Sequence, residues 1–354
     1  MKSNIDAISP APGWPAPGYL ARGTLHRVAW REVGECSGEC WLLLHGGPGG
    51  SCRPGMLQPF DLARQRVIAP DQRGAGASRP RGALQGSCTA ALVADLEALR
   101  VHLGVQRWSL LAGSWGTVVA LRYAERYPER VQRMVLRGAF RITRREIGGL
   151  LLPQPRKGKA WSSGSTWPVH AGTPLPAALA HLAQLLQSAT LGVASLHAVR
   201  EWALREMRDA SAGLRRSLLH AQGADAAAVR REWSGLRKQQ RRAKAHILQP
   251  RISKADRLAW VKYRIQAHYL LHHGFVRPAG LDKAVHGIAQ HGVPMDWVHG
   301  RFDAICPPAN SLGWAKMASA AGGTVSVHLP PCGHLAGESA MRKALRQRVG
   351  GRPS

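Results

Sequence analysis

The sequence predicts an α/β protein whose mostly parallel sheet is flanked by helices and carries an inserted helical cap domain. Two observations predict this class. Short apolar runs alternate with helical patterns over residues 39–140, and a long helical block then separates these runs from further strands near the C-terminus. Strands that alternate with helices favour a parallel sheet that is covered on both faces.

Each expected strand is a short apolar run that ends at a loop rich in glycine or other small residues. We expect strands at residues 40–44, 66–70, 108–112, 131–136, 295–299 and 324–329. The segment 89–103 is expected to be an amphipathic helix, because its leucines recur at helical spacing. A second helix is expected from about Thr117 to Arg126, closed by the Tyr127-Pro128 pair.

The chain divides into three parts on this reading. Residues 1–140 form the first part of the α/β core, residues 141–290 form the helical cap, and residues 291–354 return to the core. The cap opens with a segment rich in Pro, Gly and Ser at 152–176, which is typical of a linker. From residue 176 to about 271 the pattern is helical and contains no convincing strand.

Composition excludes several classes of protein. A chain of 354 residues with 45% hydrophobic residues can bury a large core, so general disorder is excluded. No run approaches 18 apolar residues, and the N-terminus lacks the apolar segment of a signal peptide. Six cysteines without a CxxC pair indicate neither a disulfide framework nor a zinc site. We therefore expect a cytoplasmic protein without a membrane span, metal or cofactor.

The net charge is unusually high for such a protein. The 49 Lys and Arg residues exceed the 21 Asp and Glu residues by 28, and the densest basic run lies at 237–244. A field of this sign attracts polyanions. No helix-turn-helix, zinc finger, RRM or KH signature accompanies it, so no specific nucleic-acid partner is expected. A basic helix face in contact with solvent is the alternative to a polyanion-binding patch.

Ser114 is the candidate nucleophile. It lies in the segment AGSWGT at 112–117, between an expected strand and an expected helix. A sharp strand-to-helix turn needs small neighbours, which Ala112 and Gly116 provide. Such a turn lifts the hydroxyl out of the sheet and directs the amide of Trp115 at a developing oxyanion.

Asp303 and His334 are the candidates that would activate this serine. Asp303 follows the expected strand at 295–299 and His334 follows the one at 324–329, in the chain order serine, acid, histidine. Sites in open parallel sheets gather at the carboxyl ends of the strands. We expect His334 to accept the proton of Ser114 and Asp303 to orient the imidazole. The alternatives are that Asp303 is a turn residue and that His334 is an ordinary histidine.

The loop HGGPGG at 45–50 is expected to complete the oxyanion hole. Glycines after a strand let a backbone amide, that of Gly47, approach the reacting carbonyl and share its charge with Trp115. Gly46 is a candidate substrate contact in the same loop. A phosphate loop is the alternative, but the Lys and the Ser or Thr of a P-loop are missing. The segment DQRGAGAS at 71–78 is expected to be an ion-paired structural turn beneath the oxyanion loop.

Several of these segments together resemble proline iminopeptidases, serine peptidases of the α/β-hydrolase fold. The resemblance rests on HGGPGG, DQRGAGAS, AGSWGT, the run YAERYPERVQRMVLRG at 123–138, GRFDAICPP at 300–308 and CGH at 332–334. It is dense over about residues 20–140 and 290–340, and patchy in the cap. It implies removal of N-terminal proline from small peptides by a triad of Ser114, Asp303 and His334, with no metal or cofactor.

The cap departs from the family pattern. Caps of this family carry a Trp-rich segment that ends in Glu, and an R-I-E-x-H-Y-F segment whose Glu helps to bind the free amine of the substrate. Here the first resembles residues 232–237, with Arg237 at the Glu position and Glu232 as a substitute, and the second places Gln266 at its Glu position. A protonated amine prefers a carboxylate, so these departures predict weakened amine recognition. The alternative is that these three are ordinary helix residues in contact with solvent and do not bind the substrate.

Three hypotheses about function follow from the sequence. The first is a peptidase that resembles proline iminopeptidase and acts through an acyl-enzyme. The second is an esterase or amidase of the same fold whose cap lacks the free-amine site and accepts an acidic or neutral acyl group. The third is a binding protein without catalysis, attracted to polyanions by its charge. Ser114 argues against related chemistry that uses an Asp nucleophile at the same turn.

Overall fold

The computed structural model describes residues 13–153 and 166–351, and its central element is one twisted sheet. Within these residues eight strands form the sheet in the order β1-β2-β4-β3-β5-β6-β7-β8. The strands are β1 (Gly18–Arg22), β2 (His26–Gly34), β3 (Glu39–Leu44), β4 (Gln65–Pro70), β5 (Trp108–Gly113), β6 (Val131–Arg137), β7 (Met295–Val298) and β8 (Val325–His328). From β4 to β8 all neighbours are parallel, and β1 and β2 join antiparallel at one edge. The predicted α/β class with a mostly parallel sheet is confirmed.

Helices cover both faces of the sheet because its central strands are apolar on both sides. In β3, Leu42 and Leu44 belong to one hydrophobic cluster, and Trp41 and Leu43 belong to the other. The first cluster is shared with α1 (Thr89–His102), α2 (Trp115–Arg126), α8 (Gly280–Gln290) and α9 (Ala309–Ala320). The second is closed by α10 (Ser339–Gly350). The sheet is therefore buried between two helical layers.

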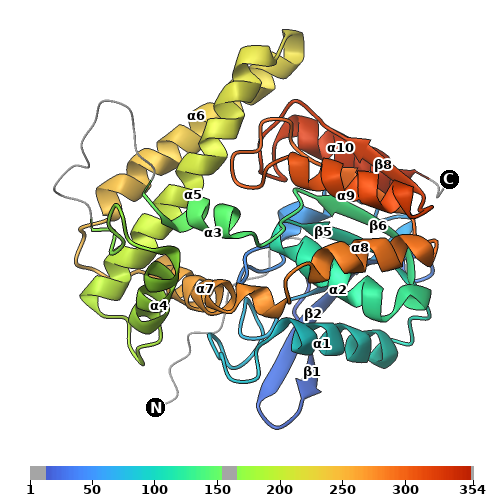
Figure 1. Ribbon diagram of the computed structural model, residues 1–354, viewed down its shortest axis with the longest axis horizontal. Coiled ribbons are helices and arrows are strands. Elements are labelled where there is room, and N and C mark those ends of the chain that lie inside the picture. The colour runs from blue at the N-terminus through green and yellow to red at the C-terminus, as the bar shows by residue number, and fades with distance from the viewer. Residues whose placement is uncertain (1–12, 154–165, 352–354) are drawn as a thin grey trace.

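The cap consists of helices that lie between β6 and α8 in the chain. They are α3 (Arg144–Leu151), α4 (Leu175–Leu186), α5 (Val193–His220), α6 (Gly223–His246) and α7 (Lys254–Leu271). Figure 1 shows these helices grouped beside the sheet, with α5 and α6 running alongside each other and extending beyond the core. The buried pair of Arg200 and Asp256, 2.8 Å apart, ties α5 to the start of α7. No strand lies in the described part of the cap, as the sequence predicts.

Two segments differ from the predicted arrangement. Helix α8 packs against α2 and α9 in the layer on the sheet, although the predicted boundary at residue 290 assigns it to the cap. The cap therefore ends near residue 279. The strands β1 and β2 have no counterpart among the predicted elements. Residues 154–165 of the predicted linker at 152–176 lie outside the described residues.

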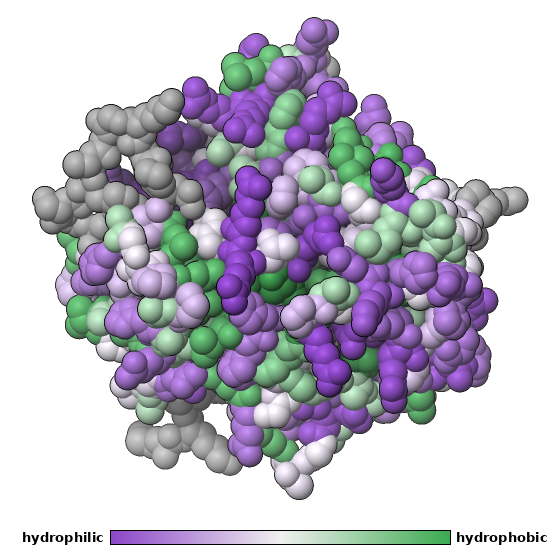
Figure 2. Space-filling view, viewed as in Figure 1, coloured by the Kyte–Doolittle hydropathy of each residue, from purple (hydrophilic) through white to green (hydrophobic). Residues whose placement is uncertain are grey.

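The surface shows no single polar patch in the view of Figure 2, where hydrophilic residues are spread over the whole visible face. In the basic run near the end of α6, Lys238, Arg241, Arg242 and Lys244 are exposed. Of the helices in the described residues, none has the length and apolar character needed to cross a membrane.

Candidate active site

Ser114 stands at a strained turn between β5 and α2. Its φ of 56° and ψ of −125° place it in a region that residues other than glycine rarely adopt. Three bonds hold this backbone: the Ser114 amide donates to the carbonyl of Arg137 at 2.8 Å, and its own carbonyl accepts from the amide and hydroxyl of Thr117 at 2.9 and 2.7 Å. Gly116 must be small, because a Cβ there would lie 2.6 Å from the carbonyl of Leu44. The turn has the predicted strand-turn-helix context.

Asp303 and His334 form a buried pair. Nδ1 of His334 lies 2.6 Å from Oδ2 of Asp303, and the side chain of Asp303 is fully covered. The other carboxylate oxygen accepts the amides of Ile305 and Cys306 at 2.8 and 2.9 Å. Burial acts to raise the pKa of Asp303, but the neighbouring His334 and His299 outweigh it and hold the pKa well below its usual range. The carboxylate is thus ionised and can fix the orientation of the imidazole.

The end of β6 brings this pair next to the serine turn. Gly138 follows β6, and a Cβ added to it would lie 3.4 Å from Cε1 of His334 and 3.5 Å from Oδ2 of Asp303. The preceding residue, Arg137, accepts the Ser114 amide and donates from its side chain to the carbonyl of His334 at 2.5 Å. In the described residues no hydrogen bond joins the imidazole to the Ser114 hydroxyl. Catalytic hydrogen bonds are often long before a substrate binds.

The glycine loop after β3 lies directly above Ser114. A Cβ on Gly46 would come within 3.3 Å of the Ser114 Cβ and 3.9 Å of its hydroxyl oxygen. Gly47 has a φ of 130°, which favours glycine, and within the described chain its amide donates to no acceptor. Trp115 is the first residue of α2, so its amide precedes those that bond within the helix. These two amides remain the predicted donors to an oxyanion, and we call the region that carries them the predicted oxyanion site.

Gln72 connects the two sides of this oxyanion site. Its side-chain amide donates to the carbonyl of His45 at 3.1 Å, and its side-chain oxygen accepts the indole N–H of Trp115 at 3.0 Å. The backbone amide of Gln72 also donates to Nε2 of the buried His45 at 3.1 Å. Burial lowers the pKa of His45, which keeps this ring neutral and able to accept that bond. Gln72 therefore joins the two elements that carry the predicted donors, the loop after β3 and the start of α2.

The residues on either side of Gln72, Asp71 and Arg73, make contacts that hold the turn. Arg73 binds Asp95 at 2.5 Å, and Asp71 accepts the amides of Cys52 and Ala77 at 2.8 Å each. These contacts fix the turn that the sequence places beneath the oxyanion loop. The sequence predicts a structural role for this segment as a whole, and it does not predict the two contacts of the Gln72 side chain.

Gln266 lies in the cap on α7 and contacts a residue that the sequence reasoning missed. Its side-chain amide donates to Oε1 of Glu206 on α5 at 2.9 Å. The other oxygen of Glu206 accepts from the ammonium of Lys262 at 2.5 Å and from the hydroxyl of Tyr263 at 3.0 Å. Burial acts to raise the pKa of Glu206, but Lys262 and these hydrogen bonds lower it overall. We call Glu206, Lys262, Tyr263 and Gln266 the cap cluster.

The other predicted cap residues lie on α6 and have different partners. Glu232 accepts the amide of Ser339 at 2.9 Å and lies 3.5 Å from Arg342, so it binds the start of α10. Arg237 is exposed, donates to Gln240 at 3.2 Å and stacks its guanidinium over Trp233. Neither hydrogen-bonds to Gln266 in the part of the chain described here. The signal that points to Glu206 is a second Trp-to-Glu segment, Trp202 to Glu206, on the preceding helix.

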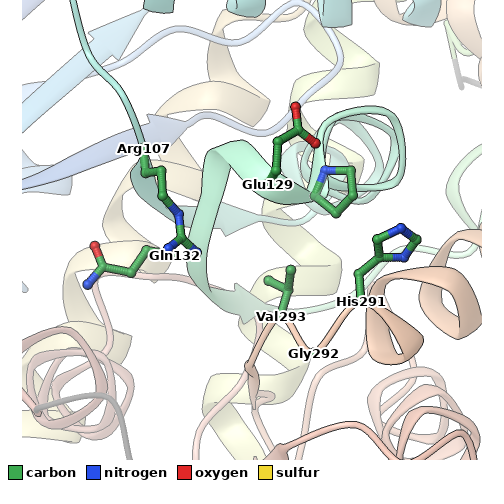
Figure 3. A pocket seen from close by; sticks show the side chains of 7 residues that line it. Arg107, Glu129, Gln132, His291, Gly292 and Val293 are labelled. Atoms are coloured by element: carbon green, nitrogen blue, oxygen red, sulfur yellow. The ribbon is translucent and has the colours of Figure 1, made fainter.

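No metal-binding group was found in the described residues, where no three His, Cys, Asp or Glu side chains are arranged to hold an ion. A surface pocket of about 310 Å³ lies beside the start of β6, at the amino ends of the strands and thus away from Ser114 at their carboxyl ends. Figure 3 shows Arg107, Glu129, Gln132 and His291 around it. None of the predicted catalytic residues lines this pocket.

Comparison with curated proteins finds relatives that are named as proline iminopeptidases. A probable proline iminopeptidase of Leptolyngbya boryana is 29% identical over 353 residues, which cover 98% of this chain and 95% of that protein. A proline iminopeptidase of Xylella fastidiosa is 43% identical over 130 residues, which cover 37% of this chain and only 42% of that relative. The resemblance read from the sequence motifs is confirmed.

Solved structures with a similar fold are α/β hydrolases of several kinds. A thermophilic esterase from Thermogutta terrifontis has a TM-score of 0.56 at 19% identity, covering 95% of this chain and 97% of that structure. An esterase from Exiguobacterium antarcticum has a TM-score of 0.56 at 15% identity, covering 94% and 97%. A family model described as the alpha/beta hydrolase fold matches residues 42–340. Together with the sheet order and the turn at Ser114, this match shows that the chain belongs to the alpha/beta hydrolase fold family.

Proposed function

We propose that the protein is a serine hydrolase that acts as proline iminopeptidases do, releasing an N-terminal proline from small peptides. Ser114 is the nucleophile, His334 the general base and acid, and Asp303 its orienting carboxylate. The observation that carries this proposal is the 2.6 Å pairing of His334 with Asp303 beside the end of β6, where the strained Ser114 is also held. The names of the curated relatives support the choice of substrate.

Acylation begins as Oγ of Ser114 forms a bond to the carbonyl carbon and its proton passes to Nε2 of His334. The negative charge on the carbonyl oxygen is stabilised by the amides of Gly47 and Trp115. The imidazole then gives its proton to the leaving nitrogen as the carbon–nitrogen bond breaks. The result is an ester between the acyl group and Ser114, and a free amine.

Deacylation repeats these steps with water. His334 takes a proton from the water while the water oxygen bonds to the acyl carbon, and the oxyanion forms again between Gly47 and Trp115. The proton then returns to Oγ of Ser114 as the ester bond breaks. The carboxylic acid leaves and the enzyme regains its starting state.

Labelling with a fluorophosphonate probe tests the nucleophile, because only an activated serine reacts at a useful rate. We expect the wild-type protein to be labelled, and the Ser114→Ala and His334→Ala variants to be folded but unlabelled. Equal labelling of the Ser114→Ala variant and the wild type would contradict the assignment. Hydrolysis of proline 4-nitroanilide by the wild type tests the peptidase activity itself.

An esterase or amidase that acts on uncharged acyl groups is the second candidate. The observation that favours it is the partner of Glu206, whose carboxylate is already paired with the ammonium of Lys262. A free amine on the substrate would compete with that ammonium for the same carboxylate.

A further inference from the structure

The cap cluster is a small polar group with no net charge. The carboxylate of Glu206 binds the Lys262 ammonium at 2.5 Å and the Gln266 side-chain amide at 2.9 Å. The same ammonium lies 3.3 Å from the hydroxyl of Tyr263 and 4.5 Å from the centre of its ring. An ammonium has three N–H donors. Two of those on Lys262 are used by Glu206 and Tyr263, which leaves the third for another acceptor.

The cluster lies on the cap faces that turn toward the catalytic loops. On α5, Glu206 is seven residues before Gly213, which places both on one face of the helix. A Cβ on Gly213 would lie 2.9 Å from Cα of Gly333, the residue before His334. The cluster therefore lies about 10 Å along α5 from the imidazole loop, since each residue adds about 1.5 Å.

Helix α7 gives the same placement from the other side of the site. A Cβ on Gly49 of the oxyanion loop would lie 2.5 Å from the carbonyl of Lys262. One turn after Gln266, the ring of Tyr269 packs against that of Trp115 with centroids 5.1 Å apart. Lys262 and Gln266 are four residues apart and share a face of α7. The cluster thus lies over the oxyanion loop and the residue that follows Ser114.

One atom of the cluster has no partner within the described residues. Oε1 of Gln266 is a buried acceptor without a hydrogen bond, and the side chain as a whole is only 2% exposed. A buried acceptor without a donor is unfavourable, so such an atom is typical of a site that a ligand completes. Beside it, the Lys262 ammonium offers a donor.

We propose that the cap cluster binds an uncharged amide group on the acyl side of the substrate, so that the preferred substrates are N-acylated aminoacyl esters or amides. The amide C=O would accept from Lys262, and the amide N–H would donate to Oε1 of Gln266. A substrate with a free ammonium would instead lie beside the Lys262 ammonium, which repels it and already holds Glu206. This inference rests on the proposed serine hydrolase mechanism, and it favours the second candidate, an esterase or amidase for uncharged acyl groups, over release of a free N-terminal proline.

Paired substrates test the inference directly. The 4-nitroanilides of alanine and N-acetylalanine differ only at the α-nitrogen, which is an amine in the first and a neutral amide in the second. At pH 7 most of the free α-amine is protonated and therefore charged. We expect kcat/KM of the wild type to be at least about tenfold higher for the acetylated substrate, which corresponds to about 1.4 kcal/mol. A higher kcat/KM for the free amine would overturn the inference.

The Lys262→Met variant removes the ammonium and keeps the length of the side chain. We expect it to raise kcat/KM for the free-amine substrate at least about tenfold and to lower it for the acetylated one, because Glu206 becomes available to an amine. Lys254→Met is the matched control, since Lys254 is exposed on the same helix, and it should change neither value. The Gln266→Glu variant adds a carboxylate without removing a lysine and should shift the preference the same way.

Fluorophosphonate labelling separates the two possible failures. If Ser114 is labelled but Lys262→Met leaves the ratio of the two kcat/KM values unchanged, the inference about the cap cluster is wrong and the proposed mechanism stands. If Ser114 is not labelled and neither substrate is hydrolysed, the proposed function is wrong and the inference falls with it. Equal loss of both activities in Lys262→Met, with an unchanged melting temperature, would also overturn the inference.

Discussion

Gln72 is the residue whose single side chain joins the two elements that carry the predicted oxyanion donors. Its bonds to His45 and to the Trp115 indole fix the loop and the helix start that carry the two amides. We predict that Gln72→Leu lowers kcat about 10- to 100-fold with little change in KM, because removal of an oxyanion donor itself costs about 10²–10³-fold. Steady-state kinetics with an acetylated anilide and with an aryl ester would check this.

The control for this prediction is Gln239→Leu, which makes the same change at an exposed position on α6. It should leave kcat and KM at their wild-type values. A rise in KM as large as the fall in kcat, or a wild-type kcat in Gln72→Leu, would show that Gln72 does not position the oxyanion donors.

Asp303 is expected to act through His334 at every pH at which the protein is folded. Its low pKa means that it stays ionised as the pH falls to about 4, near the usual pKa of an unfolded aspartate. We predict that Asp303→Asn lowers kcat/KM roughly 10³- to 10⁴-fold, by loss of the correct imidazole tautomer. The kcat/KM of the variant should stay far below that of the wild type at every pH between 5 and 9, because Asp303 is ionised over this whole range, and pH–rate profiles of both proteins measure it.

The stability that Asp303 contributes follows from the same pKa. A carboxyl group whose folded-state pKa is lowered stabilises the protein above its unfolded pKa, and loses this contribution as the pH falls below that value. The melting temperatures of Asp303→Asn and the wild type should therefore differ by a constant amount at neutral pH, and this difference should shrink below about pH 4. Asp61→Asn, at an exposed position, is the matched control.

The residues of the site were predictable to different degrees, for a physical reason. Ser114, Asp303 and His334 each follow a short apolar strand, so their local sequence predicts a place at the carboxyl edge of the sheet. Glu206 and Lys262 are 56 residues apart on two helices. Their contact depends on how those helices are rotated and packed, which the 3.6-residue period does not specify.

Helix α5 approaches the imidazole loop more closely than a side chain would allow. A Cβ on Gly213 would lie 2.6 Å from the carbonyl of Phe302 and 2.9 Å from Cα of Gly333, both backbone atoms that cannot turn away. We predict that Gly213→Ala displaces α5 or the loop, lowers kcat/KM at least about tenfold, and destabilises the fold by about 1–3 kcal/mol. Kinetics and thermal melting would measure the two effects.

Gly235→Ala on α6 is the matched control, because nothing lies within 4 Å of the added Cβ there. Alanine is the better helix former, so this variant should be more stable than the wild type by about 0.5–1 kcal/mol, with unchanged kinetics. If Gly213→Ala behaved in the same way, the close contact between α5 and the loop would not exist in solution.

The start of α10 holds the loop of His334 through Glu338, which accepts the amides of Gly333 and Leu335 at 2.7 and 2.9 Å. Burial raises the pKa of Glu338 to about 7, and the nearby Glu232 and Asp303 add to this. A carboxyl group with a raised folded-state pKa stabilises the protein below its unfolded pKa, about 4.3, and loses that contribution as the pH rises to 7. We predict that wild type loses on the order of 1–3 kcal/mol relative to Glu338→Gln between pH 5 and 8.

Melting temperatures of the two proteins at pH 5, 6.5 and 8 would test this element of the fold. Glu129 is exposed, so Glu129→Gln is the control. The difference in melting temperature between this variant and the wild type should not depend on pH over that range. A constant difference for Glu338→Gln would show that its carboxyl group titrates at its ordinary pKa.

The parallel strands and the helical cap were predictable because each leaves a local pattern. The central strands are buried on both faces and so read as continuous apolar runs, and all six predicted strands lie within a few residues of observed ones. The edge strand β1 alternates half-buried and exposed residues over only five positions, which is too short a pattern to separate from a loop. The position of α8 depends on tertiary packing, so the predicted cap boundary was placed too late.

The charge of the whole molecule predicts attraction to polyanions without a defined site. The excess of 28 positive charges is spread along the chain, and Figure 2 shows hydrophilic residues over the whole visible face. We predict that the protein is retained on heparin at low salt and released as salt rises, since counterion release weakens such binding steeply. A double variant, Arg241→Gln and Arg242→Gln, should elute at nearly the wild-type salt concentration. Elution of this variant far earlier would reveal a specific patch on α6.

The order of the site along the chain has a consequence for its synthesis. The serine turn and both oxyanion donors are complete by residue 115, whereas the carboxylate and the imidazole arrive at residues 303 and 334. A nascent or truncated chain that stops before the last strand therefore carries an unreactive alcohol. On the proposed mechanism, Ser114 becomes reactive only after His334 has been synthesised, and two separately expressed fragments divided between β6 and β7 would have to dock before Ser114 could react.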